Sequence, residues 1–194
     1  MHYCCLLFTD KIPSEEEISN KLAPFYEETF YNNDSPDKEY PVFLWDWYSI
    51  GGRYKGGIKL KADFDDKENV KKYEWFYLTN SPRNGKLFIS SLLTYFEKVA
   101  EEKKYSFYDE TEWFPSMGIK DGFLYVEGAE TNDILNYEDL GCFCYVDSDG
   151  TANARSYWDG TKWIDKTDEV FDKELEEVKN KNKGKFVTII DLHD

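Results

Sequence analysis

The stretch Trp45-Asp46-Trp47-Tyr48-Ser49-Ile50-Gly51-Gly52-Arg53-Tyr54 holds four aromatic side chains, an acid, a Gly-Gly pair and an arginine within ten residues. An ordinary core strand rarely carries both Asp and Arg, and an ordinary surface loop rarely needs so many aromatic residues. The stretch is therefore either a structural corner that locks two halves of the fold together or the wall of a binding site.

If the stretch is a strand as far as Ile50, its side chains alternate between two faces. Trp45 and Trp47 then share one side, and Asp46 and Tyr48 share the other. A strand of this kind would place aromatic rings on both of its faces.

The Gly-Gly-Arg end of the stretch allows two interpretations. In the first, Gly51 and Gly52 let backbone N–H groups converge on an anion, and Arg53 adds a guanidinium that matches carboxylate or phosphate. With the aromatic wall, such a site suits a nucleotide or another planar anion. In the second, Gly-Gly forms a bulge, Arg53 pairs with an acid such as Asp46, and the aromatic residues are core. Because a lone Gly-Gly-Arg is a weak signal, residue chemistry alone favours this structural interpretation.

Around this stretch, the chain of 194 residues is long enough to bury a core as one domain spanning residues 1–194. Apolar patterns predict a helix that begins at Ser14 and kinks or ends near Pro24, and two further helices over residues 90–104 and 168–179. Strands are predicted over residues 3–8, 42–50, 54–60, 73–78, 123–126, 140–146, 152–157 and 185–192. The Gly residues between the second and third of these strands indicate a hairpin or a bulged strand. The predicted fold is α+β, with a mixed or mainly antiparallel sheet and about three helices packed on it, naturally on one face.

The net charge of −15, from 39 acidic against 24 basic residues, should repel nucleic acid phosphates, so no direct binding of duplex DNA is expected. The simplest reason for the acidity is solubility. A more specific one is an acidic face that occupies a basic groove on a partner protein.

The four cysteines form the pairs Cys4-Cys5 and Cys142-x-Cys144, neither of which has the spacing of a zinc knuckle or a redox motif. Both lie in apolar, strand-like runs, where a free cysteine behaves as a small buried hydrophobe. We expect no signal peptide, and no apolar run of the sequence approaches the ~20 residues that span a bilayer. These features predict a reduced, cytoplasmic protein that does not contact membranes.

A second candidate constellation lies near the end of the chain, where Asp191 and His193 are two residues apart on a predicted strand and share one face. A carboxylate beside an imidazole could orient a general base or bind a metal, although a solvated strand end is the simpler interpretation. Only His2 and His193 are histidines, which excludes a His-rich metal site. The turn Asp147-Ser148-Asp149-Gly150 lacks the glutamate of a calcium loop. We therefore predict no metal and no cofactor.

The motifs resemble a family of small proteins encoded by tailed bacteriophages. Its members share a Leu-Ala-Pro-Phe segment, matched here at Leu22 to Phe25, and a Trp-Asp-Trp-Tyr-x-x-Gly-Gly-Arg box, matched at Trp45 to Arg53. They often end in a strand with Asp-x-His, matched at Asp191 to His193, whereas the segment from residue 63 to 136 matches none of these motifs. The resemblance implies a phage or prophage origin, a location in the host bacterial cytosol and an accessory role.

The resemblance also favours a single composite site, in which the box and the Asp191 to His193 segment lie on adjacent strands. The residues expected to bind a ligand there are Asp46, Tyr48, Gly51, Gly52, Arg53, Tyr54, Asp191 and His193.

Three functions compete. The first is a non-enzymatic inhibitor of a bacterial antiviral system, such as a CRISPR nuclease or a nucleotide-signalling defence. It would bind a host defence protein through its acidic surface or sequester a nucleotide signal at the Gly-Gly-Arg site. The second is a nuclease or phosphodiesterase in which His193 is the base, Asp191 orients it and Arg53 steadies the phosphate. The third is an interaction protein without a small ligand. The few candidate catalytic groups favour the inhibitor over the enzyme, and the sequence leaves the oligomeric state open.

Overall fold

The computed structural model describes residues 1–35, 39–54, 57–63, 118–120, 123–137 and 140–194. The helix predicted over residues 90–104 and the strand predicted over residues 73–78 lie outside these ranges. In chain order, the elements are β1 (His2–Thr9), α1 (Glu15–Leu22), η1 (Ala23–Phe25), α2 (Glu27–Tyr31), β2 (Trp47–Ile50), η2 (Gly52–Tyr54), β3 (Ile58–Asp63), β4 (Gly118–Lys120), β5 (Phe123–Val126), β6 (Gly128–Glu130), η3 (Thr131–Asp133), β7 (Ile134–Tyr137), β8 (Cys144–Val146), β9 (Ala152–Ala154), β10 (Ser156–Trp158), β11 (Trp163–Asp165), α5 (Asp168–Lys181) and β12 (Phe186–His193).

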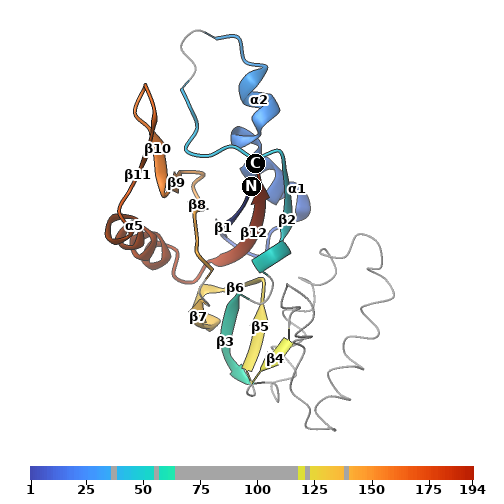
Figure 1. The fold of residues 1–194 in the computed structure, drawn as a ribbon. Helices are drawn as coiled ribbons and strands as arrows, with labels where there is room; N and C mark the ends of the chain where they lie inside the picture. The colour runs from blue at the N-terminus through green and yellow to red at the C-terminus, as the bar shows by residue number, and fades with distance from the viewer. Residues whose placement is uncertain (36–38, 55–56, 64–117, 121–122, 138–139) are drawn as a thin grey trace.

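The main sheet is built around the first and last strands of the chain (Figure 1). Its strand order is β2-β12-β1-β8-β9, and β6 also pairs with β12. β1 and β12 are antiparallel along their whole length, whereas β1 and β8 are parallel. A second, antiparallel sheet has the order β4-β5-β3-β7, and β10 and β11 form a separate hairpin. The α+β class with a mixed sheet is therefore confirmed.

The two central strands are apolar on both faces, as expected for strands with neighbours on both edges and cover on both sides. Residues 4–8 of β1 and residues 186–192 of β12 are all buried. Asp191 is the single carboxylate within β12 and is only 1% exposed. A charged group at this depth requires close hydrogen-bonding partners.

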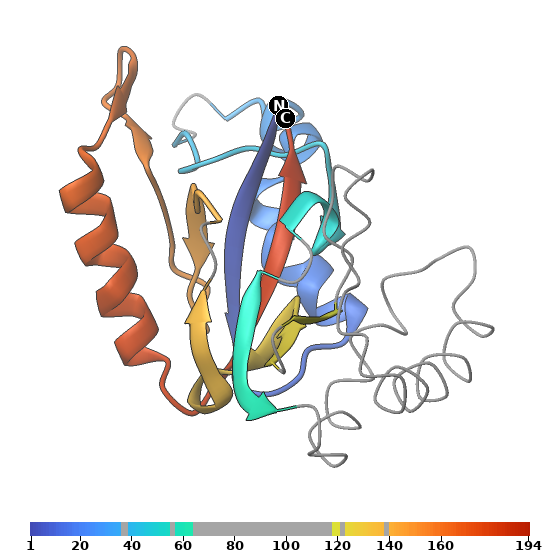
Figure 2. The ribbon, with the colours of Figure 1, turned by 60° about the horizontal axis from the view of Figure 1, so that its bottom comes forward.

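The helices cover both faces of the main sheet, which corrects the prediction of one face (Figure 2). Side chains alternate along each strand, and the register places Tyr48 and Tyr145 on opposite faces. Tyr48 lies beside Ser19 of α1, whereas Tyr145 lies against Phe171 of α5 with ring centroids 6.2 Å apart. Two apolar faces on the central strands need two covering layers.

Helix α1 begins and ends where the sequence indicates. The Ser14 hydroxyl accepts a hydrogen bond from the Glu17 backbone N–H at 3.1 Å, and the helix gives way to the 3₁₀ turn η1 at Pro24. The predicted turn at Asp147 to Gly150 is also present, since β8 and β9 pair antiparallel across it.

The strand predicted over residues 42–50 forms only from Trp47 onward, and its two tryptophans separate. The Trp45 Nε1–H donates to the Leu22 carbonyl at 2.9 Å, and the Trp45 ring contacts Tyr48 at 5.3 Å. Trp47 lies on the opposite face, against His193. The prediction that Trp45 and Trp47 share one side is wrong because Trp45 precedes the regular strand.

The hairpin predicted between β2 and β3 is also wrong. β2 pairs with β12 in the main sheet, and β3 pairs with β5 and β7 in the second sheet. Gly51 and Gly52 both have positive φ angles, 70° and 49°, and the Tyr54 N–H donates to the Gly51 carbonyl at 2.7 Å. This left-handed turn, which glycine adopts readily, sends the chain out of the main sheet.

All four cysteines are free and buried, which confirms their interpretation as small core residues. Among the described residues, no helix is long and apolar enough to cross a membrane.

Candidate functional site

The Gly-Gly-Arg turn holds the buried carboxylate of Asp191. The Arg53 backbone N–H donates to Asp191 Oδ2 at 2.9 Å. Gly52 lies so close that a Cβ at its position would be 2.2 Å from the same oxygen. The anion at the predicted backbone nest is therefore the protein's own side chain, which corrects the expectation that these amides are open to a ligand.

Asp191 also orients His2 through its other carboxylate oxygen. His2 Nδ1 lies 2.9 Å from Asp191 Oδ1, and the two side chains are 16% and 2% exposed. These two contacts satisfy both oxygens of a carboxylate that would otherwise be costly to bury. The predicted partnership of Asp191 with His193 is wrong, although the two residues do share one face of β12.

His193 pairs with Asp46 instead. Its Nδ1 lies 2.7 Å from Asp46 Oδ1, and the Asp46 backbone N–H donates to the His193 carbonyl at 2.9 Å. The hydrogen bond from His193 lowers the pKa of the Asp46 carboxyl. Asp46, the acid suggested as a partner of Arg53, thus serves as the partner of an imidazole.

The two histidine–aspartate pairs touch each other beside an exposed tryptophan. The rings of His2 and His193 have centroids 4.9 Å apart with an interplanar angle of 72°. Trp47 stacks on His193 at 5.3 Å and 16°, and meets His2 edge-on at 5.3 Å and 79°. Strand pairing explains the assembly, since His193 lies opposite His2 on one side and opposite Trp47 on the other.

The imidazoles have a defined tautomer in this arrangement. An ionised carboxylate only accepts hydrogen bonds, so each Nδ1 carries a proton that points to its aspartate. Each Nε2 then has a lone pair when the ring is neutral and a second proton when it is charged. Within the described part of the chain, no hydrogen bond engages either Nε2.

The remaining predicted residues divide between the two faces. Tyr48 points to the α1 face, away from the imidazoles, and burial raises the pKa of its hydroxyl. Tyr54 lies near Asp191 and Cys4, and burial raises the pKa of its hydroxyl to about 12. Arg53 is exposed on the turn that holds Asp191. Asp46, Asp191 and His193 thus lie on the face opposite Tyr48, and the turn with Gly52 and Arg53 reaches that face at Asp191.

Sequence reasoning missed His2 and the role of Trp47. His2 begins the first strand and Asp191 lies in the last, so the pair is separated by 189 positions. The signal that could have found it is that both histidines of the chain stand at an outer end of a terminal strand, where antiparallel pairing would make them neighbours.

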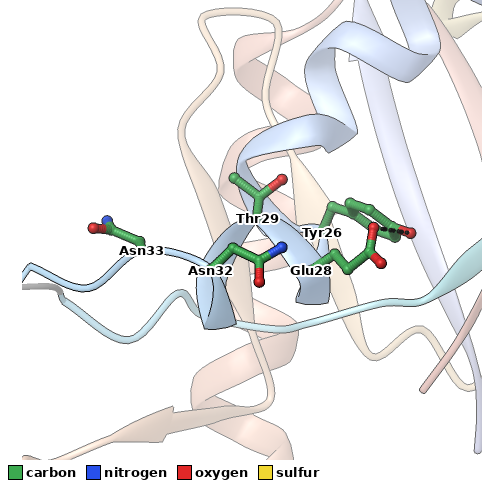
Figure 3. Close-up of a pocket in the computed structure, with 5 residues that line it drawn as sticks. All are labelled: Tyr26, Glu28, Thr29, Asn32 and Asn33. Atoms are coloured by element: carbon green, nitrogen blue, oxygen red, sulfur yellow. Dashed lines mark hydrogen bonds between the residues drawn. The ribbon is translucent and has the colours of Figure 1, made fainter.

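A separate surface pocket of about 440 Å³ lies along α2 and contains none of these groups (Figure 3). Its lining residues are Tyr26, Glu28, Thr29, Asn32 and Asn33. The Tyr26 hydroxyl donates to Glu28 at 3.3 Å, and this carboxylate raises the pKa of the tyrosine. Among the described residues, no group of three or more His, Cys, Asp or Glu side chains is placed to hold a metal ion.

Comparison with protein-family models, curated proteins and solved structures finds no match for this chain.

Proposed function

We propose that the chain cleaves phosphodiester bonds in small ribonucleotides by acid–base catalysis between His2 and His193. The observation that supports this is the contact of two imidazoles whose Nδ1 atoms are each held by a separate carboxylate, at 2.9 and 2.7 Å. The carboxylates fix the tautomers and stabilise positive charge as it forms on either ring. This geometry adds a second histidine to the enzyme alternative and outweighs the earlier preference for a non-enzymatic inhibitor.

The chemistry requires one neutral and one protonated imidazole. The neutral Nε2 removes the proton of the ribose 2′-hydroxyl, and the 2′-oxygen attacks phosphorus. The bond from phosphorus to the 5′-oxygen breaks, and the protonated imidazole donates its proton to that oxygen. The products are a 2′,3′-cyclic phosphate and a free 5′-hydroxyl, so no further reactant is needed. The exposed guanidinium of Arg53 supplies positive charge on the adjacent turn.

The charge of the protein favours a short substrate. A net charge of −15 opposes the approach of a long polyanion but has less effect on a ligand with one or two phosphates. A small ribonucleotide signal of an antiviral defence has this character. The predicted anti-defence role would then be exercised by destroying the signal.

The test uses an oligodeoxynucleotide with one ribonucleotide and a panel of ribodinucleotides, with a chelator present. We expect cleavage only at the ribonucleotide and a loss of roughly 100-fold or more in kcat/KM for His2→Ala and for His193→Ala. Asp165→Asn, which changes an exposed acid on the β10–β11 hairpin, should keep full activity. Equal activity in wild type and both histidine variants would exclude the proposal.

The acidic-surface form of the inhibitor is supported by a different observation. Exposed acids gather on α5, at Asp168, Glu169, Asp172, Glu176 and Glu177. In cells that carry the relevant defence, the histidine variants separate the two forms. Protection that survives both substitutions supports binding to a basic groove, and protection that is lost supports cleavage.

A further inference from the structure

Trp47 is unusual among the aromatic residues of the box because it stays in solvent. Its side chain is 43% exposed, whereas Trp45 is 8% exposed. Strand pairing to β12 fixes its position, since Trp47 lies opposite His193. A large aromatic ring held rigidly at the surface beside two titratable groups is typical of a binding surface.

The indole contacts both imidazoles with different parts of its surface. One face stacks on His193, with a 16° angle between the rings, and His2 meets the indole at 79°. Since His193 covers one face of the ring, the exposed area lies on the remaining face and edge. A base stacked on that remaining face would have the indole between it and His193, so the ribose and phosphate of the same nucleotide would pass the edge of the indole to reach the imidazoles.

We propose that Trp47 is the stacking platform for a nucleobase of the substrate, which makes the ligand class a nucleotide recognised through its base. This inference rests on the proposed function. Stacking of a base on an aromatic side chain needs no charge, so it provides affinity where the acidic surface provides none. It also tolerates different bases, because every base has a π-face.

A competing role for Trp47 is support of a charged His193 by ring stacking alone. The two roles predict different behaviour. A base platform affects only ligands that contain a base, whereas support of His193 affects all phosphates equally and changes the pH profile of cleavage.

The test measures equilibrium binding of adenosine 3′-monophosphate and of ribose 3-phosphate, which lacks the base. For Trp47→Leu we expect affinity for the nucleotide to fall by about 5- to 150-fold, with unchanged affinity for ribose 3-phosphate. Trp47→Phe should restore part of the affinity. Trp163→Leu is the matched control, since Trp163 is also 43% exposed but lies on the β10–β11 hairpin.

The outcomes distinguish a failure of the base platform from a failure of the catalytic proposal. Unchanged nucleotide binding in Trp47→Leu, or equal losses for the two ligands with a shifted pH profile, would overturn the base platform. A selective loss for the nucleotide confirms it even when the histidine variants leave cleavage intact, in which case only the catalytic proposal fails.

Discussion

Gly52 and Asp191 can occupy neighbouring positions only because one of them lacks a side chain. A Cβ on Gly52 would meet Asp191 Oδ2 at 2.2 Å and Ser49 Oγ at 2.6 Å, and the glycine has a φ of +49°. The Gly-Gly pair therefore lets the turn approach a buried carboxylate that in turn orients His2. The structural and functional interpretations of the box converge at this contact.

Substituting Gly52→Ala should cost about 1–3 kcal/mol more than the backbone strain alone, because the new methyl group forces Asp191 aside. Gly141→Ala is the matched control, with a φ of +52° and nothing within 4 Å of the added Cβ. That change should cost only about 1 kcal/mol, from the left-handed backbone. Urea denaturation of both variants measures the difference, and equal losses of stability would contradict the steric argument.

At the element scale, hydrogen bonds from the C-terminal end of α5 hold this helix against the β8–β9 turn. The Lys181 ammonium donates to Asp147 Oδ2 at 2.5 Å and to Asp149 Oδ2 at 2.8 Å. The Asn182 amide donates to Asp147 Oδ1 at 2.9 Å. Burial raises the pKa of Asp147, but the hydrogen bonds from Lys181 and Asn182 outweigh it and leave the pKa below its usual value.

Asp147→Ala should destabilise the protein by about 1–3 kcal/mol at pH 7, because the buried Asn182 amide loses an acceptor. The folded-state pKa is lowered, so the contribution of Asp147 is complete above the unfolded value of about 4 and is lost as the pH falls through the folded value. The difference in the free energy of unfolding between the wild type and Asp147→Ala should therefore become smaller in acid. Urea midpoints from pH 7 down to about pH 2 test this.

The control is Asp159→Ala, which removes an exposed turn carboxylate that accepts from Thr161 and Lys162 at 2.8 Å. It should change stability much less than Asp147→Ala. Similar losses of stability for Asp147→Ala and Asp159→Ala would mean that the contacts between α5 and the β8–β9 turn do not stabilise the protein.

Elements with local signals were the ones the sequence could predict. Ser14 caps α1, acids and lysines mark the two ends of α5, and β12 is rich in apolar residues. The β2–β3 hairpin was predicted wrongly because apolar periodicity shows that a strand exists but not which strand it joins. The prediction of the site was incomplete for the same reason. Asp46, Asp191 and His193 were identified, but long-range strand pairing determines their hydrogen-bonding partners.

At the scale of the whole molecule, β12 connects most of the main sheet. It pairs with β1 along its length, with β2 near its end and with β6 near its start. It also supplies Asp191 and His193 to the site. The main sheet and the candidate site therefore depend on the same eight-residue strand.

A chain truncated after Gly184 should show no cooperative urea transition, because β2 and β6 lose their partner in the main sheet and β1 keeps only its short pairing with β8. The matched control replaces residues 159–162 of the β10–β11 turn with Asn-Gly, which alters a hairpin outside the main sheet and should keep the transition. Circular dichroism followed against urea distinguishes the two. A cooperative transition in the truncated chain would show that the sheet can form without β12.

The pairing of β1 with β12 also determines when the main sheet can form during synthesis, because the ribosome makes the chain from its N-terminus. Cys4 to Phe8 leave the ribosome as an apolar segment well before residues 186–193, which form their antiparallel partner. Until then the sheet lacks its centre, and neither histidine–aspartate pair exists. A chain that stops before residue 186 would thus leave β1 exposed to proteases and chaperones and would lack both histidine–aspartate pairs.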